Sequence, residues 1–215
     1  MSEFNNAYHI TRQDAKSCFV ESLSDAFRIG KVHFTFAKYD VSRPAGQRQT
    51  DNVQIYISVE EFVGLCHKLY TGELRYVLQQ KKNNNDKSPV YQSLGGTPSS
   101  KLKETGKSRP DGMSLSRKVS LSNSNDGGVL FTAESGAGEQ NKQGLIVPRY
   151  GNNPENKVVV KMTVESFTSF ILTTQYNYIA WLSSEYMKGR KNCQFGSETQ
   201  SVDNNDYQKN ANEYY

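Results

Sequence analysis

Positive charge is concentrated in one segment of the chain, between residues 81 and 118. Nine Lys and Arg residues there outnumber three acidic ones, a local excess of six charges in a chain whose net charge is +4. Clustered cations bind polyanions because they displace the counterions condensed on phosphates. The segment therefore indicates a nucleic-acid partner, with a merely solvated loop as the alternative. Six of its side chains are expected to neutralise phosphates: Lys101, Lys103, Lys107, Arg109, Arg117 and Lys118.

Aromatic side chains supply the other group that a non-specific single-strand binder needs. The chain contains 13 Tyr and 10 Phe. A nucleobase stacked on an aromatic ring contributes on the order of 1–3 kcal/mol, whatever the base. Tyr residues at polar positions, several of them beside a basic residue, are the stacking candidates, with Arg149 as a neighbouring cation: Tyr56, Tyr91 and Tyr150.

No catalytic or metal-binding motif in the sequence has the residue spacing that it requires. The sequence "TGKS" at 105–108 matches the end of a P-loop, but position 101, where the first Gly must stand, is Lys. His9, His33 and His67 show no metal-ligand spacing. The three cysteines are widely spaced without a CxxC, which argues against a disulfide framework or a structural zinc and favours a reducing compartment. We expect no enzyme, no cofactor and no metal site.

Targeting and membrane signals are lacking in the sequence. The first residues do not combine a basic start with an apolar run, and no apolar stretch approaches the roughly 18 residues of a spanning helix. We therefore expect a soluble, cytoplasmic protein without a membrane partner.

Strand-like alternation leads into a helix at two places in the chain. "KVHFTF" and "NVQIYIS" alternate as strands, and Ser58 then caps a helix with a stripe that starts at Phe62. Further strands are expected at "VYQSL", "RKVSLS", "GGVLFTAES", "GLIVPRY" and "NKVVVKMT". Thr163 caps a second helix, for which the expected buried stripe is Phe167, Phe170, Ile171, Thr174, Tyr178 and Trp181.

Two matched blocks indicate an internal repeat. "GKVHFT" at 30–35 matches "GGVLFT" at 127–132, an offset of 97, and "NVQIYISVEEF" at 52–62 matches "KVVVKMTVESF" at 157–167, an offset of 105. Duplication explains two blocks in the same order, and convergence on common strand-to-helix chemistry is the alternative. Each helix must cover a sheet face, so the opposite faces remain free. Side chains that alternate with the core-facing ones point to those free faces and are further candidates for nucleic-acid contact: Lys31, His33, Tyr56 and Lys161.

Strands followed by a helix, twice in one chain, resemble the Whirly family of single-stranded DNA binders and the related transcriptional-coactivator fold. The resemblance spans about residues 30–188 and rests on the order of elements, without a diagnostic motif. It implies that helices pack the units together and that basic and aromatic groups on sheet faces and edges hold single strands. The sequence shows two clear strands in the first unit, where that fold has four.

The sequence thus predicts an α+β protein with mainly antiparallel sheets, in which two strand-then-helix repeat units share a core. Its expected parts are an N-terminal helical segment (1–30), a first strand-helix unit (31–80), a basic loop-rich insertion (81–118), a second strand-helix unit (119–190) and a disordered tail (191–215).

The predicted function is binding of single-stranded nucleic acid with little sequence preference, in replication, repair or DNA transfer. DNA is the favoured ligand, and RNA stays open as the alternative. The tail, which ends in two Tyr, is a candidate site for a protein partner, and a homo-oligomer stays open. The competing hypothesis is a non-enzymatic protein-interaction or structural module of a phage or mobile element.

Overall fold

The computed structural model describes residues 7–197, with side chains up to residue 189. Residues up to Asn177 form one compact unit, and a second unit begins at Tyr178, inside the last helix. The packing described below is that of the first compact unit.

The first antiparallel sheet is built from the first four strands in chain order, each paired with the next. Two helices follow it directly. Ser58 begins the first of these as predicted, because its Oγ accepts a hydrogen bond from the Glu61 backbone N–H at 3.2 Å. The elements are β1 (His9–Ala15), β2 (Cys18–Leu23), β3 (Lys31–Tyr39), β4 (Gln49–Ser58), α1 (Val59–Tyr70) and α2 (Glu73–Asn83).

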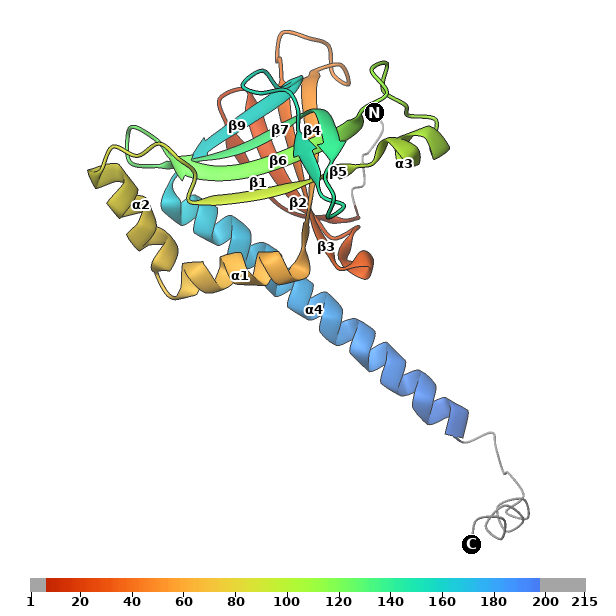
Figure 1. Cartoon of the computed structure of the whole chain (residues 1–215). Coiled ribbons are helices and arrows are strands. Elements are labelled where there is room, and N and C mark those ends of the chain that lie inside the picture. The colour runs from red at the N-terminus through yellow and green to blue at the C-terminus, as the bar shows by residue number, and fades with distance from the viewer. Residues whose placement is uncertain (1–6, 198–215) are drawn as a thin grey trace, which may run out of the picture. The chain divides into compact units, whose positions relative to one another are not determined.

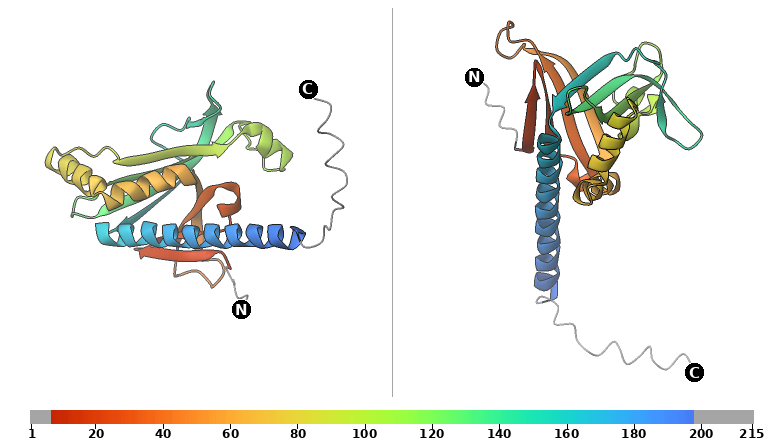
Figure 2. Two further views of the ribbon diagram at one scale, coloured as in Figure 1. Left: turned by 90° about the horizontal axis from the view of Figure 1, so that it is seen from below. Right: turned by 90° about the vertical axis from the view of Figure 1, so that its left-hand side faces the viewer.

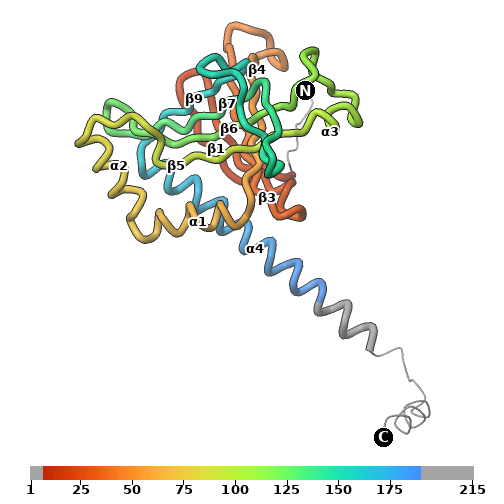
Figure 3. Tube along the Cα trace, viewed as in Figure 1, coloured from red at the N-terminus to blue at the C-terminus, as the bar shows by residue number. Residues whose placement is uncertain are grey.

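The second antiparallel sheet has the order β5-β6-β7-β8, and β9 also pairs with β7. A short helix interrupts it after β5, and a long helix follows β9 (Figure 3). The elements are β5 (Tyr91–Thr97), α3 (Ser99–Glu104), β6 (Ser114–Asn123), β7 (Val129–Gln140), β8 (Ile146–Pro148), β9 (Asn156–Met162) and α4 (Val164–Ser197).

The structure confirms the predicted fold class, with two antiparallel sheets and strand-then-helix units that share a core (Figure 1). The strand register also reproduces the repeat. His33 of β3 lies opposite Tyr56 of β4, and Leu130 of β7 lies opposite Lys161 of β9. The offset of 97 relates His33 to Leu130, and the offset of 105 relates Tyr56 to Lys161, so the two cross-strand pairs are equivalent in the repeat. Convergent propensity has no reason to reproduce a cross-strand register, so the register favours duplication.

The shared core centres on two equivalent phenylalanines, Phe34 of β3 and Phe131 of β7. Their ring centroids lie 5.9 Å apart in an edge-on arrangement. Phe34 contacts Phe62 of α1 at 6.2 Å, and Phe131 makes the equivalent contact with Phe167 of α4 at 5.2 Å. All four rings are fully buried. Phe62 of α1 thus contacts the first sheet, while α4 contacts both sheets, because its Phe170 also lies 5.5 Å from Phe34. The two sheets meet through the pair at the centre.

The helices that follow the two sheets also contact each other. Tyr70 Oη of α1 lies 3.5 Å from Tyr176 Oη of α4, and Arg75 of α2 pairs with Glu165 of α4 at 2.9 Å. Figure 2 shows the first sheet in red and orange and the second in green and cyan. In the described part of the chain, no helix combines the length and apolar character needed to cross a membrane.

The predicted N-terminal helical segment is wrong, because β1 and β2 occupy this region. Cys18, Phe19, Leu23 and Phe27 have near-helical spacing, but Cys18 and Phe19 point to opposite faces of β2. Only a short 3-10 helix at Phe27–Ile29 is helical there, before β3 begins. The first unit thus has four strands.

The predicted basic insertion at 81–118 is not an insertion either. It contains the end of α2, the strand β5, α3 and the first half of β6, so it supplies the opening strands of the second unit. Its Ser, Gly and Lys content resembles that of a loop because β5 and β6 bury mostly small side chains, such as Ser93 and Ser116.

The end of α4 also differs from prediction. Burial stops at Thr174, while Tyr178 and Trp181 are partly exposed and contact each other at 5.8 Å. The predicted tail begins at 191, but the backbone of 191–197 continues α4. The rest of the tail, including the terminal tyrosines, lies outside the described residues.

Replacing Phe131 by Ala should lower the free energy of unfolding by about 3–5 kcal/mol, because it leaves a cavity between the sheets. Urea unfolding followed by circular dichroism measures this loss. Tyr76→Ala is the matched control: the Tyr76 side chain is 65% exposed, so the change should stay within about 0.5 kcal/mol. A loss below about 1 kcal/mol for Phe131→Ala would contradict the central position of this ring.

Candidate nucleic-acid-binding cleft

The two sheets meet along two junctions that the repeat makes equivalent. At one, β9 contacts β1 and β2, and at the other, β4 contacts β5 and β6. Cys18 of β2 lies opposite Lys38, and Arg117 of β6 lies opposite Ser135. Because Lys38 and Ser135 are related by the offset of 97, Cys18 and Arg117 occupy equivalent positions at the two junctions.

The junction at Cys18 is closed. Its buried thiol donates a hydrogen bond to the Val159 carbonyl oxygen of β9 at 3.2 Å, which links β2 to the edge of β9. Burial raises the pKa of this thiol, so it stays protonated and can donate.

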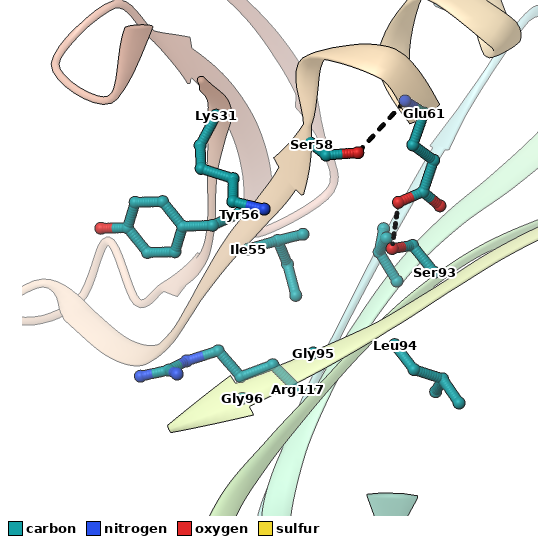
Figure 4. Close-up of a pocket in the computed structure, with 11 residues that line it drawn as sticks. Lys31, Ile55, Tyr56, Ser58, Glu61, Ser93, Leu94, Gly95, Gly96 and Arg117 are labelled. Carbon is teal, nitrogen blue, oxygen red and sulfur yellow. Dashed lines mark hydrogen bonds between the residues drawn. The ribbon is translucent and has the colours of Figure 1, made fainter. Parts of the chain in front are cut away.

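The junction at Arg117 is open and forms a cleft of about 280 Å³ (Figure 4). Residues of β3, β4, α1, β5 and β6 line it. Gly95 of β5 contributes to the space, since the pairing register puts Ala15 at the matching position opposite Cys18. A side chain at Gly95 would project into open space. The two junctions therefore differ in shape and in charge.

Two cations line the cleft without a carboxylate partner. In the described residues, neither Lys31 nor Arg117 has an acidic side chain within ion-pair distance, and Arg117 Nη1 donates to Thr97 Oγ1 at 2.8 Å. Burial lowers the pKa of Arg117, since its guanidinium has lost water without gaining a counter-charge. The acidic group of the cleft, Glu61, already accepts hydrogen bonds from Tyr91 Oη at 3.0 Å and Ser93 Oγ at 2.9 Å.

Tyr56 forms an aromatic platform at the mouth of the cleft. Its ring stacks on that of His33, with centroids 4.2 Å apart and planes 17° from parallel, and the residue is 42% exposed. His33 Nδ1 donates to Asp25 Oδ1 at 2.9 Å, and its Nε2 lies against Gln54 Oε1, which also accepts from Thr35 Oγ1 at 2.8 Å. His33 is thus held on both sides and fixes the orientation of Tyr56.

Three of the predicted residues therefore line one cleft, Lys31, Tyr56 and Arg117, while His33 lies behind Tyr56. His33 is 5% exposed, so it is a positioning residue rather than a direct phosphate contact.

Two predicted stacking residues, Tyr91 and Tyr150, do not offer a free ring face, and that prediction is corrected. Tyr91 turns toward the interior to donate to Glu61, and burial raises its pKa. Tyr150 packs on Gly136, its hydroxyl is buried, and burial raises its pKa to about 12. Both side chains pack against the protein, which alternation alone could not show.

Four predicted cations are held by carboxylates, which reduces the charge they offer a phosphate. Strand register determines which carboxylate some of these cations meet. Lys118 and Lys157, for example, both pair with the buried Glu134 from the two neighbouring strands. The predicted residues and their partners are Arg109 with Asp111 and Glu155, Lys118 with Glu134, Arg149 with Glu139, and Lys161 with Asp126.

The remaining predicted cations, Lys101, Lys103 and Lys107, lie exposed on α3 and on the turn after it. Sequence reasoning missed Asp25 and Gln54, which hold the His33 ring, and Gly95 and Gly96, which line the cleft. A signal existed for Gly95 and Gly96, because paired glycines within a strand mark a close approach or an open space.

The fold and the cleft define a duplicated antiparallel α+β protein with a cationic cleft beside a fixed aromatic ring. Comparisons of the chain with protein-family models, with curated proteins and with solved structures found no match. Among the described residues, no three His, Cys, Asp or Glu side chains come together as a metal site would require.

Glu134→Gln should weaken the protein at neutral pH more than in acid. Burial opposes ionisation, but hydrogen bonds from Lys118 and Lys157 lower the pKa of Glu134 below its ordinary value of 4.5. The stabilisation is therefore present above pH 4.5 and is lost as the pH falls through the lower, folded-state pKa. Urea midpoints between pH 3 and 7 should converge for wild type and variant at the acid end. A difference that stays constant with pH would contradict this ionic role.

Proposed function

We propose that the protein binds single-stranded nucleic acid with little sequence preference, with DNA as the favoured ligand and RNA as the alternative. The observation that carries the proposal is the open cleft in which Lys31 and Arg117 lack acidic partners beside the exposed ring of Tyr56. A phosphate between the two cations would restore the counter-charge that Arg117 lacks, and a base could stack on Tyr56.

The aromatic ring beside the cleft favours a single strand. A base can stack on Tyr56 only if its ring face is free, and the bases of a duplex are already stacked on one another. Stacking and phosphate contact tolerate every base, because all bases have a π face and phosphates carry no sequence information. Replication, repair or DNA transfer in the cytoplasm is the setting that such binding suits.

The competing proposal is a protein-interaction or structural module. Exposed tyrosines on the helices favour it, since Tyr70, Tyr76 and Tyr176 are each more than half exposed. The same binding experiments decide between the two classes.

Wild-type protein should bind fluorescein-labelled oligothymidylate at low salt, with an affinity that falls as salt rises. Each neutralised phosphate contributes about 0.7 to the slope of log K against log salt for single strands. Fluorescence anisotropy at two or more salt concentrations measures both values, and duplex and oligouridylate probes test the preferences for one strand and for DNA. No binding at micromolar protein in low salt would remove the proposal and leave the interaction module.

Arg117→Gln and Tyr56→Ala should each weaken that binding in a different way. Arg117→Gln should lower the salt slope by about 0.7, because one phosphate contact is lost. Tyr56→Ala should reduce affinity by about 5- to 150-fold, equivalent to about 1–3 kcal/mol, with the slope unchanged, whereas Tyr56→Phe should bind like wild type.

Two controls separate the cleft from general effects of charge and folding. Lys142→Gln removes one exposed charge at the turn between β7 and β8 and should leave binding unchanged. Gly95→Leu keeps every charge but fills the cleft, so it should weaken binding while the urea midpoint stays near wild type. Equal losses for Lys142→Gln and Arg117→Gln would contradict a site at the cleft.

A further inference from the structure

The strand that borders the cleft leads directly to a second basic surface. β5 passes the cleft at Gly95 and Gly96, and only Thr97 and Pro98 follow before α3 begins. Figure 1 shows α3 beyond the end of β5. A strand of nucleic acid that leaves the cleft at Gly96 therefore meets α3 next.

The lysines on and after α3 have no acidic partners in the described chain. Lys101, Lys103 and Lys107 are exposed, and within residues 7–197 none of them has a carboxylate at ion-pair distance. Glu104 is the acidic residue of this short segment, which leaves a net excess of two positive charges. The outer face of the second sheet differs, because its lysines are paired: Lys118 and Lys157 with Glu134, and Lys161 with Asp126.

A second hollow lies beside the α3 lysines. It encloses about 410 Å³, and its lining residues include Ser99, Ser100, Lys103, Ser108 and Met113. Arg109 also lines it, but its charge is taken up by Asp111 and Glu155. The hollow thus has Lys103, a cation without a carboxylate partner in the described chain, among serine residues and a methionine.

The α3 segment is held in place without any ligand. Leu102 is buried, its carbonyl accepts the backbone N–H of Lys107 at 2.8 Å, and the Ser99 N–H donates to Ser114 Oγ of β6 at 3.1 Å. Arg109 donates two hydrogen bonds to each of the carboxylates of Asp111 and Glu155, which fixes the turn that follows. Little backbone conformational entropy would be lost when this surface binds a partner, so the ordering cost falls on the lysine side chains.

We propose that a bound single strand extends from the cleft past Gly96 onto α3, where Lys101, Lys103 and Lys107 contact its phosphates. The inference rests on the proposed function and adds the direction in which the strand leaves the cleft. It also assigns the outer face of the second sheet no part in binding.

Two triple variants with equal loss of charge test the direction. One is Lys101→Gln with Lys103→Gln and Lys107→Gln, and its control is Lys142→Gln with Lys157→Gln and Lys161→Gln. Anisotropy is measured with oligothymidylates of about 4 and about 16 nucleotides, the span of known single-strand modules. The α3 triple should lower the salt slope for the longer probe by about 2, since three phosphate contacts are lost, and change the short probe little. The control triple should change neither.

The outcomes separate this inference from the proposed function. If wild type binds and Arg117→Gln weakens it, but the α3 triple leaves the slope for the longer probe unchanged, the path is wrong and the cleft stands. Equal losses in the two triples would show general electrostatic attraction and would also overturn the path. If wild type binds no single strand, the function and the path fall together. Circular dichroism melting confirms that each triple is folded.

Discussion

The contact between Phe34 and Phe131 is the constraint on which the rest of the structure depends. Each ring stands at the same position of its unit, and each is covered by the first phenylalanine of its own helix. Neither sheet can remove its aromatic face from water alone, because one helix does not span a four-stranded face. When the two units pack together at these rings, both aromatic faces are buried at once. The same packing places the edge of each sheet against the other sheet, and these contacts are the two junctions.

The repeat places equivalent residue positions at the two junctions. Where those positions carry different residues, the two units differ. Core positions keep their character, as Phe34 and Phe131 illustrate. Junction positions do not: Cys18 donates to a backbone carbonyl and closes one side, while Arg117 stands at the matching position and leaves the other side open. Cross-strand pairs diverge in the same way, because His33 and Tyr56 correspond to Leu130 and Lys161. The aromatic platform therefore exists on one unit only.

The sequence predicts most of the second half of each unit, and the reason is physical. β3, β4, β7 and β9 bury one face against the core, so their alternation is clear and the repeat can be found from it. β2 lacks this signal, since apolar residues such as Phe19 and Leu23 also stand on its outer face. β5 and β6 show it over part of their length, where strands were expected at "VYQSL" and "RKVSLS", because small polar residues such as Ser93 and Ser116 fill their other buried positions.

The candidate site was predictable only in part. Residue type indicated cations and tyrosines, of which Lys31, Arg117 and Tyr56 line one cleft, but whether a cation is free depends on strand register. Lys118 is neutralised by Glu134 across a strand pair, while Arg117, one residue earlier, faces the other side and meets no carboxylate in the described chain. Adjacent basic residues in one strand thus have opposite roles, and local sequence cannot separate them.

Arg117 is costly for the protein unless something binds beside it. A guanidinium that loses water without a counter-charge destabilises the folded state, and the lowered pKa of Arg117 reflects that cost. The duplicated fold has another solution at the same position, the thiol of Cys18, which satisfies a backbone carbonyl and carries no charge. The anionic partner that we propose would supply the counter-charge that Arg117 lacks, beside a tyrosine whose ring stacks on the hydrogen-bonded His33.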